Sequence, residues 1–384
     1  MKKLTRFASL ALASVLALGT LAGCGSNGGN TFKIGGIGPI TGGAAAYGLA
    51  VKNSIQIAVD EINATGGING FKIDYDFQDD ELDAEKAVNA YNTLKDWGMQ
   101  MLVGTVTSGC CVAVVPEAKA DNMFLLTPSG SSAAILDNND IAYQVCFTDP
   151  NQGIASAKYI GEHNVASKVA VIYDSSDVYS NGIYEKFVAE SKNQPFEIVA
   201  AEAFTADNKT DFSVQLQKAN DNGADLVFLP IYYTEASLIL TQAASMGLNV
   251  KFFGCDGLDG VLGVENFDTS LAEGVMLLTP FAADATDDKT VSYVKKYVEK
   301  YGEIPNQFGA DAYDAVYIIK AALEKANAKP SMSTSDLCNA IREQLKTLSF
   351  DGLTGIGMTW DADGAVSKDP KAVVIKDGSY SLIQ

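Results

Sequence analysis

The sequence predicts an α/β protein with two doubly wound lobes, which have parallel-sheet cores and are joined by a hinge of several strands. Short apolar segments of strand length alternate with helix-length segments along most of the chain, which is typical of βαβ units. The chain has 384 residues, more than one typical hydrophobic core organises. The alternation restarts after residues 149–153, a turn-rich Asp-Pro-Asn-Gln-Gly sequence that we interpret as a break between the lobes.

The first half of the chain supplies the first series of elements. Residues 32–38 are strand-like, and Val51, Ile55 and Ile62 then recur at helical spacing. That helix should end at residues 65–67 (Thr-Gly-Gly), because glycine is preferred just past a helix end. Further elements are expected in this half as strands at 71–77, 101–103 and 123–126, a helix at 84–97, and a strand that ends near Phe147.

The second half repeats the pattern and then changes. Strands are expected at 169–173, 225–229, 250–253 and 275–278, and helices at 179–193, 209–222 and 234–247. Three helix-like stretches follow, at 287–302, 309–328 and 335–347. The C-terminus returns to strands at 372–376 and 380–383. We therefore assign residues 32–148 and 277–353 to the first lobe, and 149–276 and 354–384 to the second.

The N-terminus has the features of an export signal. A basic start precedes an apolar run over residues 7–21, which is shorter than the ~20 residues needed to span a bilayer. The sequence Leu-Ala-Gly-Cys that ends at Cys24 resembles the lipobox of bacterial lipoproteins. The resemblance implies that residues 1–23 are a signal peptide, that Cys24 carries a lipid and that residues 24–31 form a tether. An ordinary signal peptide with a chance cysteine is the alternative.

The charge of the chain excludes one class of partner. With the first 23 residues removed, 25 Lys and Arg face 47 Asp and Glu, a formal charge of −22. Nucleic acids need Lys and Arg to replace the counterions of their phosphates, so we expect no nucleic-acid partner. No later apolar stretch approaches the length of a membrane span.

The cysteines indicate neither a metal site nor a full set of disulfides. Besides Cys24 there are five, at positions 110, 111, 146, 255 and 338. An odd number leaves at least one thiol over, and the adjacent pair lacks the spacing of zinc ligands. Cys111 with Cys146 is the preferred pair because both fall in the first lobe. Buried thiols are the alternative.

The residues that follow the strands suggest a binding site, because ligands of open α/β sheets lie beyond the carboxyl ends of the strands. In the first lobe, a small hydroxyl-bearing loop leads to Ser108 and a helix start, which favours an anion. The next strand is followed by a second loop of Ser and Gly, at residues 127–132. The second lobe offers Tyr179, Tyr232 and Asp256 at the corresponding places. Hydroxyls on one side would take a carboxylate, and Asp256 on the other would take an ammonium.

With these features, the chain resembles the leucine/isoleucine/valine-binding proteins, the type I periplasmic binding proteins of ABC importers, over nearly all of residues 32–384. The order and spacing of several stretches carry the resemblance: residues 34–42, 46–48, 62–70, 104–109, 147–153, 308–316 and 353–355. The family pattern implies that Ser108 and the turn Ser129-Gly130-Ser131 hold the α-carboxylate and part of the ammonium. It places Asp256 as the acidic partner of the ammonium. Tyr47, Tyr179 and Tyr232 match the wall positions of the site.

The resemblance also implies how such a protein works. It is a lipid-anchored protein on the outer face of the bacterial cytoplasmic membrane, acts as a monomer and uses no cofactor or metal. It captures a branched-chain or related aliphatic amino acid by hinge closure between its lobes. It then delivers the amino acid to a membrane permease driven by an ATPase subunit, and it is not an enzyme.

Other readings remain open at this point. A dinucleotide-binding enzyme would need a third glycine after Gly36 and Gly38, where Pro39 and Ile40 follow instead. The acidic run at residues 79–81 could suggest a metal or acid/base pair, but three consecutive acids after a strand favour a solvated turn. A ligand-sensing extracellular subunit shares the fold, and it would need a signalling segment after the lobes. A small amide is the alternative ligand.

Overall fold

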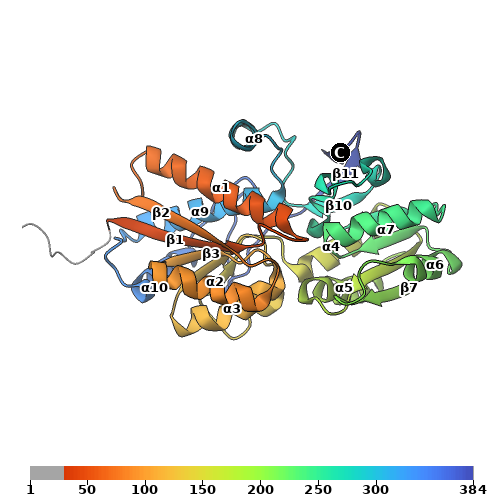
Figure 1. Cartoon of the computed structure of the whole chain (residues 1–384), viewed down its shortest axis with the longest axis horizontal. Coiled ribbons are helices and arrows are strands. Elements are labelled where there is room, and N and C mark those ends of the chain that lie inside the picture. Colours follow the sequence, from red (N-terminus) through yellow and green to blue (C-terminus); the bar gives the residue numbers. More distant parts are fainter. Residues whose placement is uncertain (1–29, 384) are drawn as a thin grey trace, which may run out of the picture.

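The structure, a computed structural model, describes residues 30–383. Within them the chain forms two α/β lobes that lie next to each other along the long axis of the molecule (Figure 1). The predicted signal peptide, Cys24 and nearly all of the tether lie outside the described residues. In the part of the chain that the structure describes, no helix has the length and apolar character needed to cross a membrane.

The first lobe is built on a five-stranded sheet of order β2-β1-β3-β4-β5, and every strand pair in it is parallel. Its strands are β1 (Thr31–Gly38), β2 (Lys72–Asp79), β3 (Met101–Gly104), β4 (Phe124–Thr127) and β5 (Ala142–Gln144). Helix α1 (Ala45–Ala64) packs with α9 (Gln307–Lys325), and α2 (Ala84–Trp97) packs with α3 (Ser108–Ala120). Figure 1 shows these two pairs on opposite faces of the sheet. Both faces are therefore covered, as the continuous apolar strands predict.

The second lobe is built on a seven-stranded sheet of order β12-β11-β10-β9-β8-β6-β7. The strands are β6 (Lys168–Asp174), β7 (Glu197–Phe204), β8 (Leu226–Leu229), β9 (Lys251–Gly254), β10 (Met276–Thr279), β11 (Lys371–Lys376) and β12 (Ser379–Leu382). Only the pairs β10–β11 and β11–β12 are antiparallel among the described strands. The helices of this lobe are α4 (Asp149–Glu162), α5 (Val178–Ser191), α6 (Ser213–Asp221) and α7 (Tyr233–Ser245).

Between β10 and β11 the chain returns to the first lobe. Helix α8 (Asp288–Tyr301) contacts α1, and α10 (Thr334–Leu345) contacts β4. The lobe boundaries given above stay a prediction, with two differences in detail. Strand β10 pairs within the seven-stranded sheet as far as Thr279, a few residues beyond the predicted crossing. The Trp360 indole donates a 2.9 Å hydrogen bond to the Gln144 carbonyl, so the chain still borders the first sheet after residue 353.

Two predictions of local structure were wrong or incomplete. Residues 149–153 do not form a turn: they are the first turn of α4, which Thr148 precedes in extended conformation. Pro150 fits there because the first helical turn has no use for its missing N–H. Strand β7 was not predicted, since it is an edge strand whose Glu197 and Glu202 interrupt the apolar pattern.

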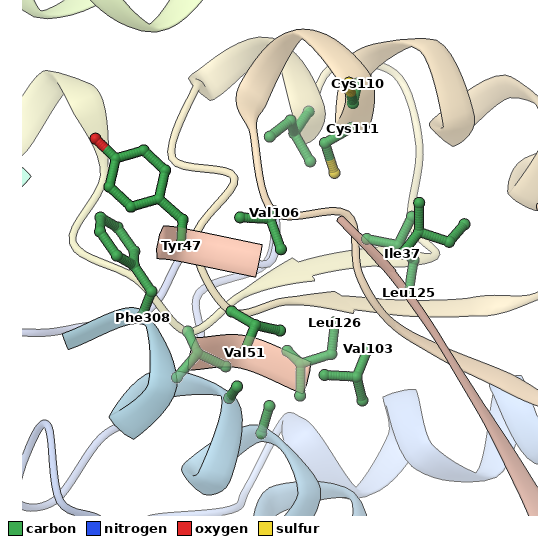
Figure 2. Packing of buried hydrophobic residues seen from close by; sticks show 14 of the residues in the cluster. Ile37, Tyr47, Val51, Val103, Val106, Cys110, Cys111, Leu125, Leu126 and Phe308 are labelled. Carbon is green, nitrogen blue, oxygen red and sulfur yellow. The ribbon is translucent and has the colours of Figure 1, made fainter. Parts of the chain in front are cut away.

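The core of the first lobe fixes the strand ends that carry the site. Figure 2 shows Val51 of α1 near Val103 and Leu126 of the central strands, all three fully buried. At the border of this cluster Tyr47 lies beside Phe308 of α9, with ring centroids 4.5 Å apart. The Tyr47 hydroxyl points away from the aliphatic side chains, toward the second lobe.

Candidate binding site between the lobes

Ser108 organises the first-lobe side of the candidate site. It begins α3 directly after the loop that follows β3. Its Oγ accepts hydrogen bonds from the backbone N–H groups of Ser131 and Ser132, both at 3.2 Å. The two predicted loops are thus joined, and the Ser108 hydroxyl keeps its own proton for another acceptor. The first N–H groups of this 13-residue helix are also free of helical partners, which favours an anion here.

The turn after β4 is held by the same kind of contact. The Ser129 hydroxyl donates to the Val106 carbonyl at 2.7 Å, and the Gly130 N–H donates to Thr127 Oγ1 at 2.7 Å. Gly130 lies so close to its neighbours that a Cβ there would meet Thr127 Oγ1 at 2.7 Å and Cys111 Cβ at 3.2 Å. Glycine is therefore required at this position for packing. The Ser129 hydroxyl donates its proton to a carbonyl of the same lobe, whereas the Ser108 hydroxyl can donate its proton to a ligand.

Asp256 lies on the second-lobe side, just after β9, and is 3% exposed. Its Oδ1 accepts a 2.7 Å hydrogen bond from the Tyr179 hydroxyl, and its Oδ2 accepts one of 2.9 Å from Gln152 Nε2. The Asp256 N–H returns a 3.1 Å hydrogen bond to Gln152 Oε1. Burial raises the pKa of the Asp256 carboxyl to about 7, and the bonds from Tyr179 and Gln152 oppose part of that rise.

Aromatic rings line the space between the two sides. Tyr179 and Tyr232 stack with centroids 5.0 Å apart and planes at 12°, and Tyr47 meets Tyr232 edge-on at 5.8 Å. The Tyr47 hydroxyl donates to the Gly257 carbonyl and accepts a 3.3 Å hydrogen bond from the Tyr233 N–H. Tyr47 belongs to the first lobe and Gly257 to the second, so this side chain bridges the lobes.

Further hydrogen bonds join the lobes around these residues. Thr234 Oγ1 donates to the Gly43 carbonyl at 2.6 Å, and the Ala46 N–H donates to the Tyr233 hydroxyl at 3.2 Å. The Asp149 N–H donates to the Ser131 carbonyl at 2.9 Å. Tyr47, Ser108, Ser129, Gly130, Ser131, Tyr179 and Asp256 are all buried, and Tyr232 is partly buried. The structure thus has its lobes closed over the site.

Sequence reasoning missed three polar residues of the second lobe. Gln152 and Asp149 lie at the start of α4, where the sequence predicts a break between elements. Asp177 precedes α5 as its cap. Asp149 is fully buried, and neither carboxylate oxygen has a hydrogen-bond partner within residues 30–383. Burial raises its pKa, as do the nearby charges of Asp256 and Asp177, and burial also raises the pKa of Asp177 to about 6. This side of the site is therefore rich in carboxyl groups that a cation would stabilise.

A cavity of about 270 Å³ opens between the lobes next to these residues. Its first-lobe wall includes Leu82, Thr107 and Cys110, and its second-lobe wall includes Asp177, Phe204, Ile231 and Tyr232. Thr107 and Asp177 neighbour Ser108 and Tyr179 in sequence, so the cavity adjoins the candidate site. Apolar and polar side chains alternate around it, which suits a ligand with charged and aliphatic parts.

Two further predictions need correction. Cys111 and Cys146 form no disulfide: all five described cysteines are buried free thiols. The Cys146 Sγ instead lies 3.3 Å from the Gly130 carbonyl, and Cys111 Cβ lies 3.2 Å from the place that a Cβ of the same glycine would take. The acidic run at 79–81 is not a solvated turn throughout. Asp80 is fully buried with its pKa raised to about 6 by burial, and its Oδ1 accepts a hydrogen bond from the Leu82 N–H.

Comparison with known proteins gives a consistent result. The family model described as periplasmic binding protein matches residues 31–379. A Leu/Ile/Val-binding protein, BraC3, of Rhizobium johnstonii is 30% identical over 77% of this chain and 79% of its own length. A leucine-, isoleucine-, valine-, threonine- and alanine-binding protein of Pseudomonas aeruginosa is 27% identical over 91% of this chain and 89% of its own.

A solved structure extends the likeness to the fold. The substrate-binding protein LivJ of the branched-chain amino acid transporter from Streptococcus pneumoniae, in complex with isoleucine, superposes with a TM-score of 0.83. Its sequence is 30% identical to this chain, and the match covers 92% of this chain and 99% of that one. The two-lobed architecture described above is thus shared with a protein that was solved in complex with isoleucine.

Proposed function

This chain belongs to the periplasmic binding protein family, whose members bind solutes and are not enzymes, and we propose that it captures a branched-chain or related aliphatic amino acid for an ABC importer. One observation carries the proposal. Across the closed site, the neutral donors at Ser108 and the start of α3 stand on one lobe, and the buried Asp256 stands on the other. Such opposite polarity suits a zwitterion with its carboxylate toward the first lobe and its ammonium toward the second.

Each predicted residue then has a task in the proposal. Ser108 donates its hydroxyl proton to the ligand carboxylate, and the turn of Ser129, Gly130 and Ser131 positions Ser108 through the N–H of Ser131. Asp256 pairs with the ammonium. Tyr47, Tyr179 and Tyr232 enclose the ligand, and its aliphatic part extends toward Leu82, Phe204 and Ile231 in the adjoining cavity. The names of the relatives, which include leucine, isoleucine and valine, support this ligand class.

Closure of the lobes is the proposed means of capture. The ligand docks on the first lobe, and the second lobe then closes through the contacts of Tyr47 with Gly257 and of Thr234 with Gly43. Closure removes both charged ends from water, and an unpaired buried charge costs several kcal/mol by general estimates. A molecule that lacks the ammonium leaves Asp256 unpaired and is therefore rejected, and one that lacks the carboxylate loses the hydrogen bond from Ser108. The closed monomer delivers its ligand to the permease and its ATPase from the outer face of the membrane, where the lipid on Cys24 holds it.

Titration calorimetry on the lipid-free protein tests the ligand assignment. Leucine, isoleucine and valine should each bind with one molecule per chain, without added cofactor or metal. Two matched molecules separate the charged ends: 4-methylpentanoate lacks the ammonium of leucine, and 3-methylbutylamine lacks its carboxylate. Both should bind much more weakly than leucine. No heat with the three amino acids, together with saturable binding of isovaleramide, a purine or a sugar, would contradict the proposal.

The anchor is tested separately. Replacement Cys24→Ala removes the acceptor of the lipid, so the protein should leave the membrane fraction or keep its leader. Metabolic labelling with a palmitate analogue should mark the parent protein and not the variant. Labelling of the variant as strong as that of the parent would exclude Cys24 as the lipid site.

A further inference from the structure

A second and larger cavity lies away from the amino-acid site. It has a volume of about 510 Å³ and is bounded by both lobes. The first lobe contributes Leu49 and Ala50 of α1, Tyr297 of α8 and residues 303–306, which precede α9. The second lobe contributes residues 259–263, strand β10 and the turn between β11 and β12. Figure 1 shows α8 on the same side of the molecule as β10 and β11, next to one end of α1.

The lining of this cavity combines aromatic rings with carboxylates. Phe281, Tyr297 and Tyr380 supply the rings, and Asp259, Asp284 and Glu303 supply the acids. No lysine, arginine or histidine is among the described residues that line it. Aromatic faces and carboxylates both attract organic cations, and nothing in the lining offers a positive partner to an anion.

Asp259 is the most informative of the acids because it is 8% exposed yet borders the cavity. Its Oδ2 accepts hydrogen bonds from the Gln307 N–H at 2.9 Å and from Gln307 Nε2 at 3.3 Å. Its Oδ1 accepts none from residues 30–383, so the buried carboxylate keeps one acceptor for a ligand. Burial raises the pKa of Asp259 to about 6, which leaves it ionised at pH 7.5.

We propose that this cavity is a second binding site, which takes a small organic cation with an apolar body. The ammonium of such a ligand pairs with Asp259, and its apolar part lies against Phe281, Tyr297 and Tyr380. The site is distinct from the amino-acid site: α1 separates them, with Tyr47 on one side and Leu49 on the other.

Occupancy of the cavity is coupled to lobe closure, and this second step rests on the proposed function. The cavity exists only where both lobes contribute its walls, so a ligand in it stabilises the closed arrangement. Gln307 also provides a direct link, because its Nε2 lies 3.3 Å from Asp259 Oδ2 and 3.5 Å from the Asp256 carbonyl. The coupling is reciprocal. If the cation raises the affinity for the amino acid by a given factor, the amino acid must raise the affinity for the cation by the same factor.

Titration of the whole lipid-free protein with phenethylammonium at pH 7.5 tests the binding step. One molecule should bind per chain, and 2-phenylethanol and phenylacetate, its neutral and anionic counterparts, should bind at least about tenfold more weakly. Asp259→Asn should weaken phenethylammonium about tenfold, because it removes the charge and keeps the shape. Asp96→Asn, at an exposed acid of α2, is the matched control and should not change the affinity.

Two further variants keep the test decisive if Asp259→Asn does not fold. Gly263→Trp places a bulky side chain at a lining position where a Cβ meets nothing within 4 Å, so it should block the probe. Asp256→Asn keeps the backbone carbonyl that Gln307 contacts, so it should change phenethylammonium affinity less than Asp259→Asn does. If Asp256→Asn abolishes phenethylammonium binding and Gly263→Trp does not, this cation binds in the amino-acid site. That result would overturn the proposal.

The remaining outcomes separate this proposal from the proposed function. Absence of saturable phenethylammonium binding overturns the second site, whatever leucine does. Binding that persists in a protein that fails to bind leucine supports the second site and contradicts the amino-acid assignment. Binding to both, with competition between them, overturns the second site. Binding to both without any mutual change of affinity keeps the site and overturns its coupling to closure.

Discussion

The two sides of the candidate amino-acid site differ in the charge of the groups that face the ligand. The first-lobe side is neutral: it presents the Ser108 hydroxyl, which the backbone N–H groups of Ser131 and Ser132 hold in place. The second-lobe side is acidic: Asp149 and Asp256 are buried there, Asp177 is partly buried, and all three have raised pKa values. Neutral donors lose little on desolvation, whereas buried carboxylates need a cation or a proton. The first side is therefore suited to initial docking, and the second stabilises only a bound ligand that carries an ammonium.

The largest expected effect comes from removing the charge of the acidic side. Asp256→Asn keeps the shape of the side chain and can retain bonds to Tyr179 and Gln152, but it leaves the ligand ammonium unpaired. Leucine affinity should fall by about 2–5 kcal/mol, the usual cost of truncating one partner of a buried charged pair. Calorimetry against the parent measures the loss.

Asp96→Asn, at an exposed acid on α2, is the control and should bind leucine like the parent. Asp80 is unsuitable for that purpose because it is buried with a raised pKa. Equal leucine affinity of Asp256→Asn and the parent would mean that the contrast between the two sides does not come from Asp256.

The acidic side should also make binding depend on pH. In the closed arrangement without a ligand, burial raises the pKa of Asp256 to about 7, so this carboxyl is largely protonated at pH 5.5. An ammonium favours the ionised carboxylate and lowers that pKa, so binding below pH 7 must release a proton. Affinity should therefore fall as pH decreases below about 7, by at most about tenfold for each pH unit. Dissociation constants at pH 7.5 and 5.5 measure the effect.

Asp256→Asn should flatten this pH profile because it removes the proton that is released. A profile that stays steep in the variant would assign the proton to Asp149 or Asp177, which have raised pKa values on the same side. Either result tells which carboxyl group of the acidic side releases the proton, since Ser108 and the Ser129–Ser131 turn have no group that titrates in this range. A flat profile in the parent protein would contradict the pairing of an ammonium with this side.

The neutral side should give a smaller effect. Ser108→Ala removes the hydroxyl that accepts from the Ser131 and Ser132 N–H groups and, as proposed, donates to the ligand carboxylate. A loss of about 1–3 kcal/mol in leucine affinity is expected, because buried donors lose their partner. Unlike the effect of pH on Asp256, this loss should be the same at pH 7.5 and 5.5.

Ser132→Ala is the matched control for that experiment. The Ser132 hydroxyl accepts from the Ala134 N–H at 3.4 Å, a contact within its own short helical turn. Its replacement should therefore change leucine affinity less than Ser108→Ala. A larger loss of affinity in Ser132→Ala than in Ser108→Ala would assign the contact with the ligand carboxylate to Ser132 instead of Ser108.

The two sides also differ in how far sequence alone could describe them. The strands and most helices were predictable because apolar runs and helical spacing mark them, and the first-lobe loops follow such strands directly. Ser108 and Asp256 stand out as polar residues at strand ends. Gln152 could not be connected with Asp256, since 104 residues separate them and a turn was expected where α4 begins. Burial of Asp149 likewise depends on how the lobes meet, which no local pattern records.

The smallest effect should come from the residue that bridges the two sides. Tyr47→Phe removes the hydroxyl that donates to the Gly257 carbonyl and accepts from the Tyr233 N–H, but it keeps the ring against Phe308. Both backbone groups belong to the second lobe, so the lost bonds exist only in the closed form. Leucine affinity should fall by about 1 kcal/mol, the net value of such a bond. The loss should appear in the dissociation rate, because docking on the first lobe does not need this hydroxyl. Stopped-flow kinetics separate the two rates, and a slower association with unchanged dissociation would mean that Tyr47 acts in docking rather than in closure.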